Sequence, residues 1–234
     1  MYAPENTLAA FKLAISQNAD AIELDAKCSA DGEVVIIHDQ TLERTTDGSG
    51  KVLDHPLDGL KEFDAGSWFD NRFQGEAIPT LEEVFEVIGG KIFINIELTN
   101  YASPRDNLSY KVVELVKRFG MKNNVLFSSF NPLAIRWAHK LLPDIPLGLL
   151  ALPGIGGIWA RSWPAKFVPY QALHTEVGDT TPKLIQKQHK KGHRVHVWTV
   201  NAPEKMQQLF EWKVDGIFTD DPLLAQQVQK RAAE

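Results

Sequence analysis

The chain has 234 residues, of which 44% are hydrophobic and 24% are charged. This composition is typical of a globular protein with a large core, and the length fits one domain over residues 1–234, since α/β barrels often have about 250 residues. The formal net charge is −5, which excludes an overall positive field able to hold nucleic acid. A phosphate group would therefore have to be bound by local charges.

Cys28 is the one cysteine of the chain, which excludes an internal disulfide and a multi-cysteine metal site. A lone thiol fits a reducing compartment, and we expect a cytoplasmic protein. No run approaches the roughly 20 apolar residues that cross a bilayer, so no membrane span is predicted. The composition does not predict the oligomeric state.

Helical and extended segments alternate along the chain. Apolar residues recur at helical spacing in segments 5–18, 80–90, 106–119, 131–142, 182–191, 202–213 and 221–233. Strands are predicted at 20–27, 92–98, 125–129, 146–150, 170–174, 193–199 and 215–219. Strands separated by single helices form either an open doubly wound sheet or a closed barrel, and the number of strands favours a (β/α)8 TIM barrel.

The predicted barrel is irregular in three places. The chain opens on a helix and contains seven strands that each precede a helix, so the first barrel strand is predicted to be missing from this chain. We expect it upstream, within about 5–12 residues. A longer insertion is predicted at about 40–78, and residues 151–168, where a helix is due, read as irregular.

Acidic side chains share one face of two predicted strands. Because side chains alternate along a strand, Glu23 and Asp25 project together, as do Asn95 and Glu97. Both pairs lie at C-terminal strand ends, where barrel enzymes build their active sites. Buried acids repel one another unless a cation lies between them, so we predict an oxygen-rich site for Mg2+ or Ca2+ rather than zinc. The alternative for each acid is a solvated strand end paired with a lysine.

A histidine is predicted beside these acids. The Asp-Gly pair at 31–32, between two β-rich runs, is the signature of a two-residue hairpin turn. That turn would pair Asp25 with His38 on the same face, and a histidine there is a candidate general acid or base. The alternative is a structural histidine. His174 and Trp198, at predicted strand ends, are weaker candidates for ligand contact, and Trp198 could equally belong to the core.

Several motifs, taken together, have a familiar order. They are Ala-Pro-Glu-Asn-Thr at 3–7, Glu-Leu-Asp at 23–25, His-Asp at 38–39, Leu-Glu-Arg-Thr-Thr at 42–46, Asn-Ile-Glu at 95–97, Ser-Phe-Asn at 129–131 and Trp-Thr-Val-Asn at 198–201. In order and spacing they resemble the glycerophosphodiester phosphodiesterase family over nearly the whole chain. The resemblance implies a barrel enzyme of lipid and glycerol metabolism that hydrolyses glycerophosphodiesters, such as deacylated phospholipids, to an alcohol and sn-glycerol 3-phosphate.

The resemblance also implies roles for particular residues. The ligands of one divalent cation, Mg2+ or Ca2+, would be Glu23, Asp25 and Glu97. One of two catalytic histidines would be His38. The small-molecule glycerophosphodiester would be bound by Glu5, Phe130 and Trp198, with the two aromatic rings bordering the glycerol.

Two departures from the family pattern bear on activity. Family members usually begin with a strand that ends in His-Arg-Gly and supplies the second histidine and a phosphate-binding arginine, and this is the strand predicted to be missing. The family also commonly has a lysine where this chain has Thr99, which removes one positive charge. The alternative function is a catalytically silent barrel that binds glycerophosphodiesters. A phosphodiesterase acting on intact membrane lipids is disfavoured, because no basic amphipathic helix is evident.

Overall fold

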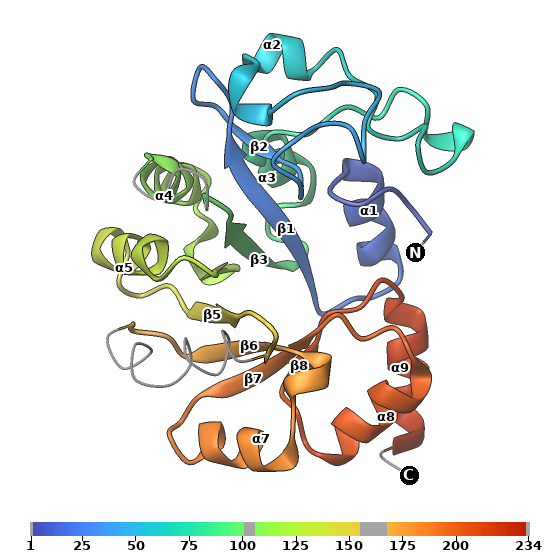
Figure 1. Cartoon of the computed structure of the whole chain (residues 1–234), viewed down its shortest axis with the longest axis vertical. Helices are drawn as coiled ribbons and strands as arrows, with labels where there is room; N and C mark the ends of the chain where they lie inside the picture. Colours follow the sequence, from blue (N-terminus) through green and yellow to red (C-terminus); the bar gives the residue numbers. More distant parts are fainter. Residues whose placement is uncertain (1, 101–105, 155–167, 233–234) are drawn as a thin grey trace.

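The computed structural model describes residues 2–100, 106–154 and 168–232, and its strands form one curled sheet (Figure 1). The strands are β1 (Ala21–Cys28), β2 (Val34–Ile36), β3 (Phe93–Leu98), β4 (Val125–Ser129), β5 (Leu147–Ala151), β6 (Ala172–Glu176), β7 (Arg194–Trp198) and β8 (Gly216–Ile217). The helices are α1 (Leu8–Ser16), α2 (Leu57–Leu60), α3 (Leu81–Ile88), α4 (Leu108–Arg118), α5 (Pro132–Leu141), α7 (Pro182–His189), α8 (Pro203–Glu211) and α9 (Pro222–Ala232). Each helix and strand predicted from the sequence is present, with ends displaced by a few residues.

The strands follow the order β2-β1-β3-β4-β5-β6-β7-β8 across the sheet. The seven strands from β1 and β3 to β8 are parallel, whereas β2 is antiparallel to β1. The connecting helices cover the outer face of the curled sheet, as Figure 1 shows. This arrangement confirms the predicted α/β class and the TIM-barrel type of fold.

Within the described residues the sheet does not close, because β1 and β8 do not pair. Between them lies a cavity of about 1110 Å3, whose walls include Glu23 of β1 and Ile217 of β8. On the outer side the first and last helices meet: the Gln226 side chain in α9 donates hydrogen bonds to the carbonyl oxygens of Gln17 (2.9 Å) and Asn18 (2.8 Å), directly after α1. The opening lies where an additional barrel strand is predicted.

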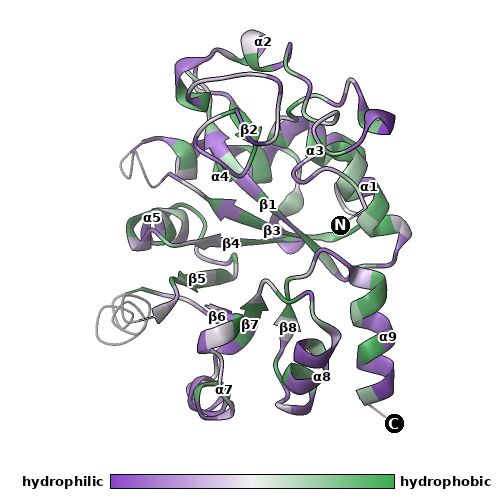
Figure 2. Ribbon diagram, turned by 45° about the vertical axis from the view of Figure 1, so that its right-hand side comes forward, coloured by the Kyte–Doolittle hydropathy of each residue, from purple (hydrophilic) through white to green (hydrophobic). Residues whose placement is uncertain are grey.

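The alternation along β1 separates the apolar core from the interior of the barrel. Ile22 and Leu24 belong to the largest apolar cluster, which packs the sheet against α1, α3, α4 and α5. Full burial of such a side chain contributes about 1.5–3 kcal/mol. Figure 2 shows the apolar residues concentrated in the strands, while α7 and α8 carry mostly hydrophilic residues. The intervening residues Glu23 and Asp25 are left to face the barrel interior.

The predicted insertion forms a cap with a small core of its own. It contains α2 and two short 3-10 helices, Val52–Asp54 and Asn71–Phe73, and lies beyond the C-terminal end of β1, at the top of Figure 1. Its apolar cluster includes Leu42, Val52 and Leu60. Of the segment predicted as irregular, residues 155–167 lie outside the described part of the chain. No helix in the described part is long and apolar enough to cross a membrane.

Candidate active site

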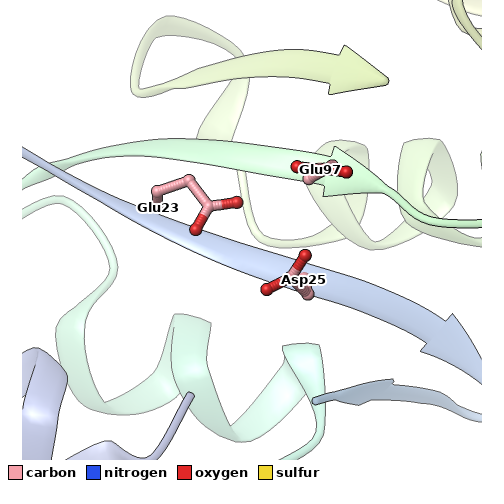
Figure 3. A group of neighbouring side chains, drawn as sticks. All are labelled: Glu23, Asp25 and Glu97. Carbon is pink, nitrogen blue, oxygen red and sulfur yellow. The ribbon is translucent and has the colours of Figure 1, made fainter. Parts of the chain in front are cut away.

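Three carboxylates meet where β1 and β3 pair. Glu23 and Asp25 lie within β1 and not at its C-terminal end as predicted, whereas Glu97 is the next-to-last residue of β3. The parallel register sets Glu23 beside Asn95 and Asp25 beside Glu97. Figure 3 shows Glu23 and Asp25 on one strand and Glu97 on its neighbour, with the three side chains gathered on one face. Their ligand oxygens all lie within 4.8 Å of one another. The acids predicted as metal ligands are therefore brought together by the fold.

Burial makes this cluster electrostatically costly. The pKa of Glu23 is raised well above its usual range by burial and by the charges of Asp25 and Glu97. Burial also raises the pKa of Asp25, although His38, Lys27 and a hydrogen bond from Asn6 oppose the shift. Such a cluster binds protons or a cation more readily than it remains fully charged.

Asn6 forms two hydrogen bonds with Asp25. Its amide nitrogen donates to Asp25 Oδ2 at 2.9 Å, and its amide oxygen accepts from the Asp25 backbone N–H at 3.1 Å. In contrast, Glu23 Oε1 is buried without a hydrogen-bond partner among the described residues. An orphaned buried carboxylate oxygen is rare in proteins. Oxygens that share one hard cation at roughly 2.1–2.6 Å lie no more than about 4–5 Å apart, so the three acids fit one divalent cation.

The hairpin that carries His38 differs from its predicted register by one residue. Observed pairs include Ala26 with Ile36, and the Ile37 N–H donates to the Asp25 carbonyl at 3.0 Å, so Asp25 does not face His38 as predicted. The reason is the loop, which has three residues instead of two and ends on Gly32 at φ +84°. A one-residue shift reverses the face of every side chain in a strand. This reversal does not apply to His38, because β2 ends at Ile36 and His38 lies outside the strand.

His38 belongs to a charged network over the acids. Its Nδ1 lies 2.7 Å from Asp39 Oδ1, and its side chain is 61% exposed. Arg44 donates to Asp39 through Nε at 2.7 Å and holds both carboxylate oxygens of Glu5 at 2.9 and 2.6 Å. Glu5, the third residue of the Ala-Pro-Glu-Asn-Thr motif, is thus tied to the insertion by a bidentate ion pair.

The network sets the protonation of its members. Partial burial lowers the pKa of His38, but the charge of Asp25 and the contact with Asp39 outweigh it, and the pKa is raised. The hydrogen bond from Arg44 lowers the pKa of Asp39 to about 2. Asp39 is therefore ionised at neutral pH and contacts the imidazole through Nδ1.

Two aromatic rings contact each other at the ends of β4 and β7. Phe130 and Trp198 are 5.7 Å apart between ring centroids and meet edge to face at 90°. The Trp198 Nε1 is buried without a partner among the described residues. The predicted pair of aromatic residues is thus assembled by strands that lie far apart in the sequence.

His174 does not lie where the sequence predicted. Because β6 runs from Ala172 to Glu176, His174 is in mid-strand and fully buried instead of ending the strand at the catalytic face. Its Nε2 is 3.1 Å from Nδ1 of His196 on β7. Burial lowers the pKa of His174 well below its usual range, so this histidine is neutral inside the barrel.

One buried cation escaped the sequence analysis. Lys27 is 5% exposed, and its Nζ donates a 2.6 Å hydrogen bond to Thr99 Oγ1. Burial lowers the pKa of Lys27, while Asp25 and Glu97 oppose the shift. The signal was present in the sequence, since Lys27 follows Asp25 by two residues and shares its face. Its contact with Thr99 joins two residues 72 positions apart and depends on the fold.

A curled α/β barrel with a cluster of carboxylates on two neighbouring strands is an architecture typical of barrel enzymes. The model of the glycerophosphoryl diester phosphodiesterase family matches residues 1–224. The chain belongs to this family of enzymes.

Relatives agree in sequence and in structure. The chain is 40% identical to a glycerophosphodiester phosphodiesterase of Caldanaerobacter subterraneus subsp. tengcongensis, over 94% of this chain and 89% of the relative. A phosphodiesterase of Oleispira antarctica, solved in complex with the product sn-glycerol-3-phosphate, has a TM-score of 0.89 and 33% identity, over 97% of this chain and 92% of that one. A glycerophosphodiester phosphodiesterase of Agrobacterium tumefaciens str. C58 has a TM-score of 0.82 and 30% identity, over 100% and 95%.

Proposed function

We propose that this protein hydrolyses glycerophosphodiesters to an alcohol and sn-glycerol 3-phosphate, with one divalent cation, Mg2+ or Ca2+, bound by Glu23, Asp25 and Glu97. The observation that carries the proposal is the convergence of these three acids within 4.8 Å around an orphaned buried carboxylate oxygen. The product bound by the Oleispira antarctica relative supports the substrate class. A cation at the three acids supplies charge neutralisation at the phosphate oxygens.

The other side chains of the site have separate roles in the proposed reaction. His38 exchanges a proton at Nε2 with the attacking or leaving oxygen, since Nδ1 is engaged by Asp39 at 2.7 Å. Glu5 orders the substrate side of the site and is itself held by Arg44. The rings of Phe130 and Trp198 form an apolar wall for the glycerol carbons. The relatives from Caldanaerobacter subterraneus, Oleispira antarctica and Agrobacterium tumefaciens are named as phosphodiesterases, which favours an enzyme over the catalytically silent alternative.

The test is release of sn-glycerol 3-phosphate from glycerophosphocholine by the purified chain, with Mg2+ or Ca2+ and with a chelator. We expect turnover that depends on the cation. Glu97→Gln is the matched variant, because it keeps the shape of the side chain and removes one ligand charge. We expect it to lose both turnover and cation affinity, measured by titration calorimetry. Turnover that persists in the chelator, or equal cation affinity in the two proteins, would contradict the proposal.

A further inference from the structure

The site face of β1 carries a cation after its two acids. Glu23, Asp25 and Lys27 alternate with Leu24 and with residue 26, so all three project to the same side of the strand. Lys27 is 5% exposed. Burying an ammonium costs free energy unless it has charged or polar partners. The burial of Lys27 next to the acids therefore requires an explanation.

Thr99 holds this ammonium in place. Its Oγ1 accepts from Lys27 Nζ at 2.6 Å and donates to the Ala26 carbonyl at 2.8 Å. The backbone N–H of Thr99 donates to the same carbonyl at 3.2 Å. Because the hydroxyl proton is used by Ala26, the oxygen presents a lone pair to Lys27. An ammonium has three donors, and Thr99 occupies one of them.

The net charge of the acid cluster indicates the role of Lys27. Three carboxylates with one divalent cation leave the site with a charge of −1, which repels a phosphodiester monoanion. Lys27 brings this charge to zero. Arg44 does not do so, because Glu5 and Asp39 neutralise it in ion pairs of 2.6 and 2.7 Å. Lys27 therefore offsets the −1 left at the three acids and their cation, whereas the network of Arg44 with Glu5 and Asp39 adds no positive charge.

We propose that Lys27 binds the anionic phosphate group of the substrate and that Thr99 positions its ammonium. This inference rests on the proposed function and identifies a further residue for phosphate affinity. It also accounts for Thr99: the positive charge is supplied from β1, and the hydroxyl that follows β3 accepts a hydrogen bond from it.

The test is titration calorimetry with sn-glycerol 3-phosphate on the cation-loaded protein and on Lys27→Met, which keeps the length of the side chain and removes its charge. We expect the dissociation constant of the product to rise about tenfold or more, as for loss of a charge-assisted hydrogen bond. The affinity for the divalent cation should change in the opposite direction and increase, because a neighbouring positive charge is lost. Lys183→Met, at an exposed position on α7, is the control and should change neither constant.

A purely structural lysine gives a different result. It would lower the melting temperature of Lys27→Met and leave the product affinity of the folded protein unchanged, and that outcome would overturn the proposal. If Lys27→Met does not fold, the exchange variant Lys27→Thr with Thr99→Lys takes its place, since it returns the positive charge from position 99, directly after β3. We expect it to bind the product within a few-fold of the parent, whereas binding as weak as that of Lys27→Thr alone would also refute the inference.

The proposed function can fail separately. Product and cation binding require no turnover, so weakened product binding in Lys27→Met supports this inference even if the parent protein does not hydrolyse glycerophosphocholine. Conversely, a parent that turns over, combined with unchanged product binding in Lys27→Met, refutes the role of Lys27 and leaves the proposed function intact.

Discussion

Glu23→Gln tests the electrostatics of the acid cluster, because it removes one buried charge and nearly preserves the shape of the side chain. The folded pKa of Glu23 is raised above the unfolded value of 4.5. The folded state therefore binds this proton more tightly than the unfolded state, and the associated stability is present below pH 4.5 and lost as the pH rises through the folded pKa. Without cation, we expect the variant to be at least as stable as the parent at pH 8 and less sensitive to pH.

With the cation bound, we expect the parent to be more stable than Glu23→Gln. A cation present at 100 times its dissociation constant stabilises the folded protein by about 2.7 kcal/mol. For a chain of this size that corresponds to a rise in melting temperature of roughly 5–11 °C. If loss of one of three carboxylates weakens binding about 100-fold, the same cation concentration stabilises the variant by only about 0.4 kcal/mol, or roughly 1 °C.

The assay is thermal unfolding followed by circular dichroism, with chelator and with a Mg2+ or Ca2+ series, at pH 5 and pH 8. The parent should show a large cation-dependent rise and Glu23→Gln a small one. Equal rises in the two proteins would exclude Glu23 as a ligand. A chelated variant that melts well below the parent at pH 8 would refute the argument that this carboxylate is costly when it is charged.

Three further predictions follow from other contacts. His38→Ala should lower kcat about 100- to 10,000-fold with little change in melting temperature, and a fully active variant would remove His38 from the mechanism. Asp39→Asn removes the contact that helps raise the pKa of His38, so that pKa should fall by NMR titration; an unchanged value would show that Asp39 does not act on the imidazole. Thr80→Ala breaks the capping box of α3 and should cost about 1 kcal/mol in urea unfolding, whereas an unchanged midpoint would mean that the cap is replaced.

Local sequence signals predicted most of the secondary structure correctly. The box formed by Thr80 and Glu83 begins α3, and Asn131 caps α5 ahead of Pro132. These signals succeed because each depends on side chains within one helical turn of the backbone groups they satisfy. The grouping of Glu23, Asp25 and Glu97 was also predictable, since the period of two and the common direction of parallel strands are general properties of such sheets.

The hairpin shows where local reasoning fails. An Asp-Gly pair favours a two-residue turn, but the observed loop also includes Ala30 and shifts the register by one residue. The difference between two common turns is small, and packing decides it. The apolar residues Val35 and Ile37 on one face of the second strand join the core of the insertion. A register shifted by one residue would expose them.

The sequence alone determined the order of strands and helices, the class of fold and the faces on which the acids lie, because these follow from the alternation and spacing of residues near one another. Only the tertiary structure decided the contacts between distant residues. Arg44 neutralises Glu5 across 39 positions, and Lys27 meets Thr99 across 72. Such pairs depend on how strands align and where the insertion folds back, and no local pattern records that geometry. The pairing of Arg44 with Glu5 and of Lys27 with Thr99 therefore follows from the fold.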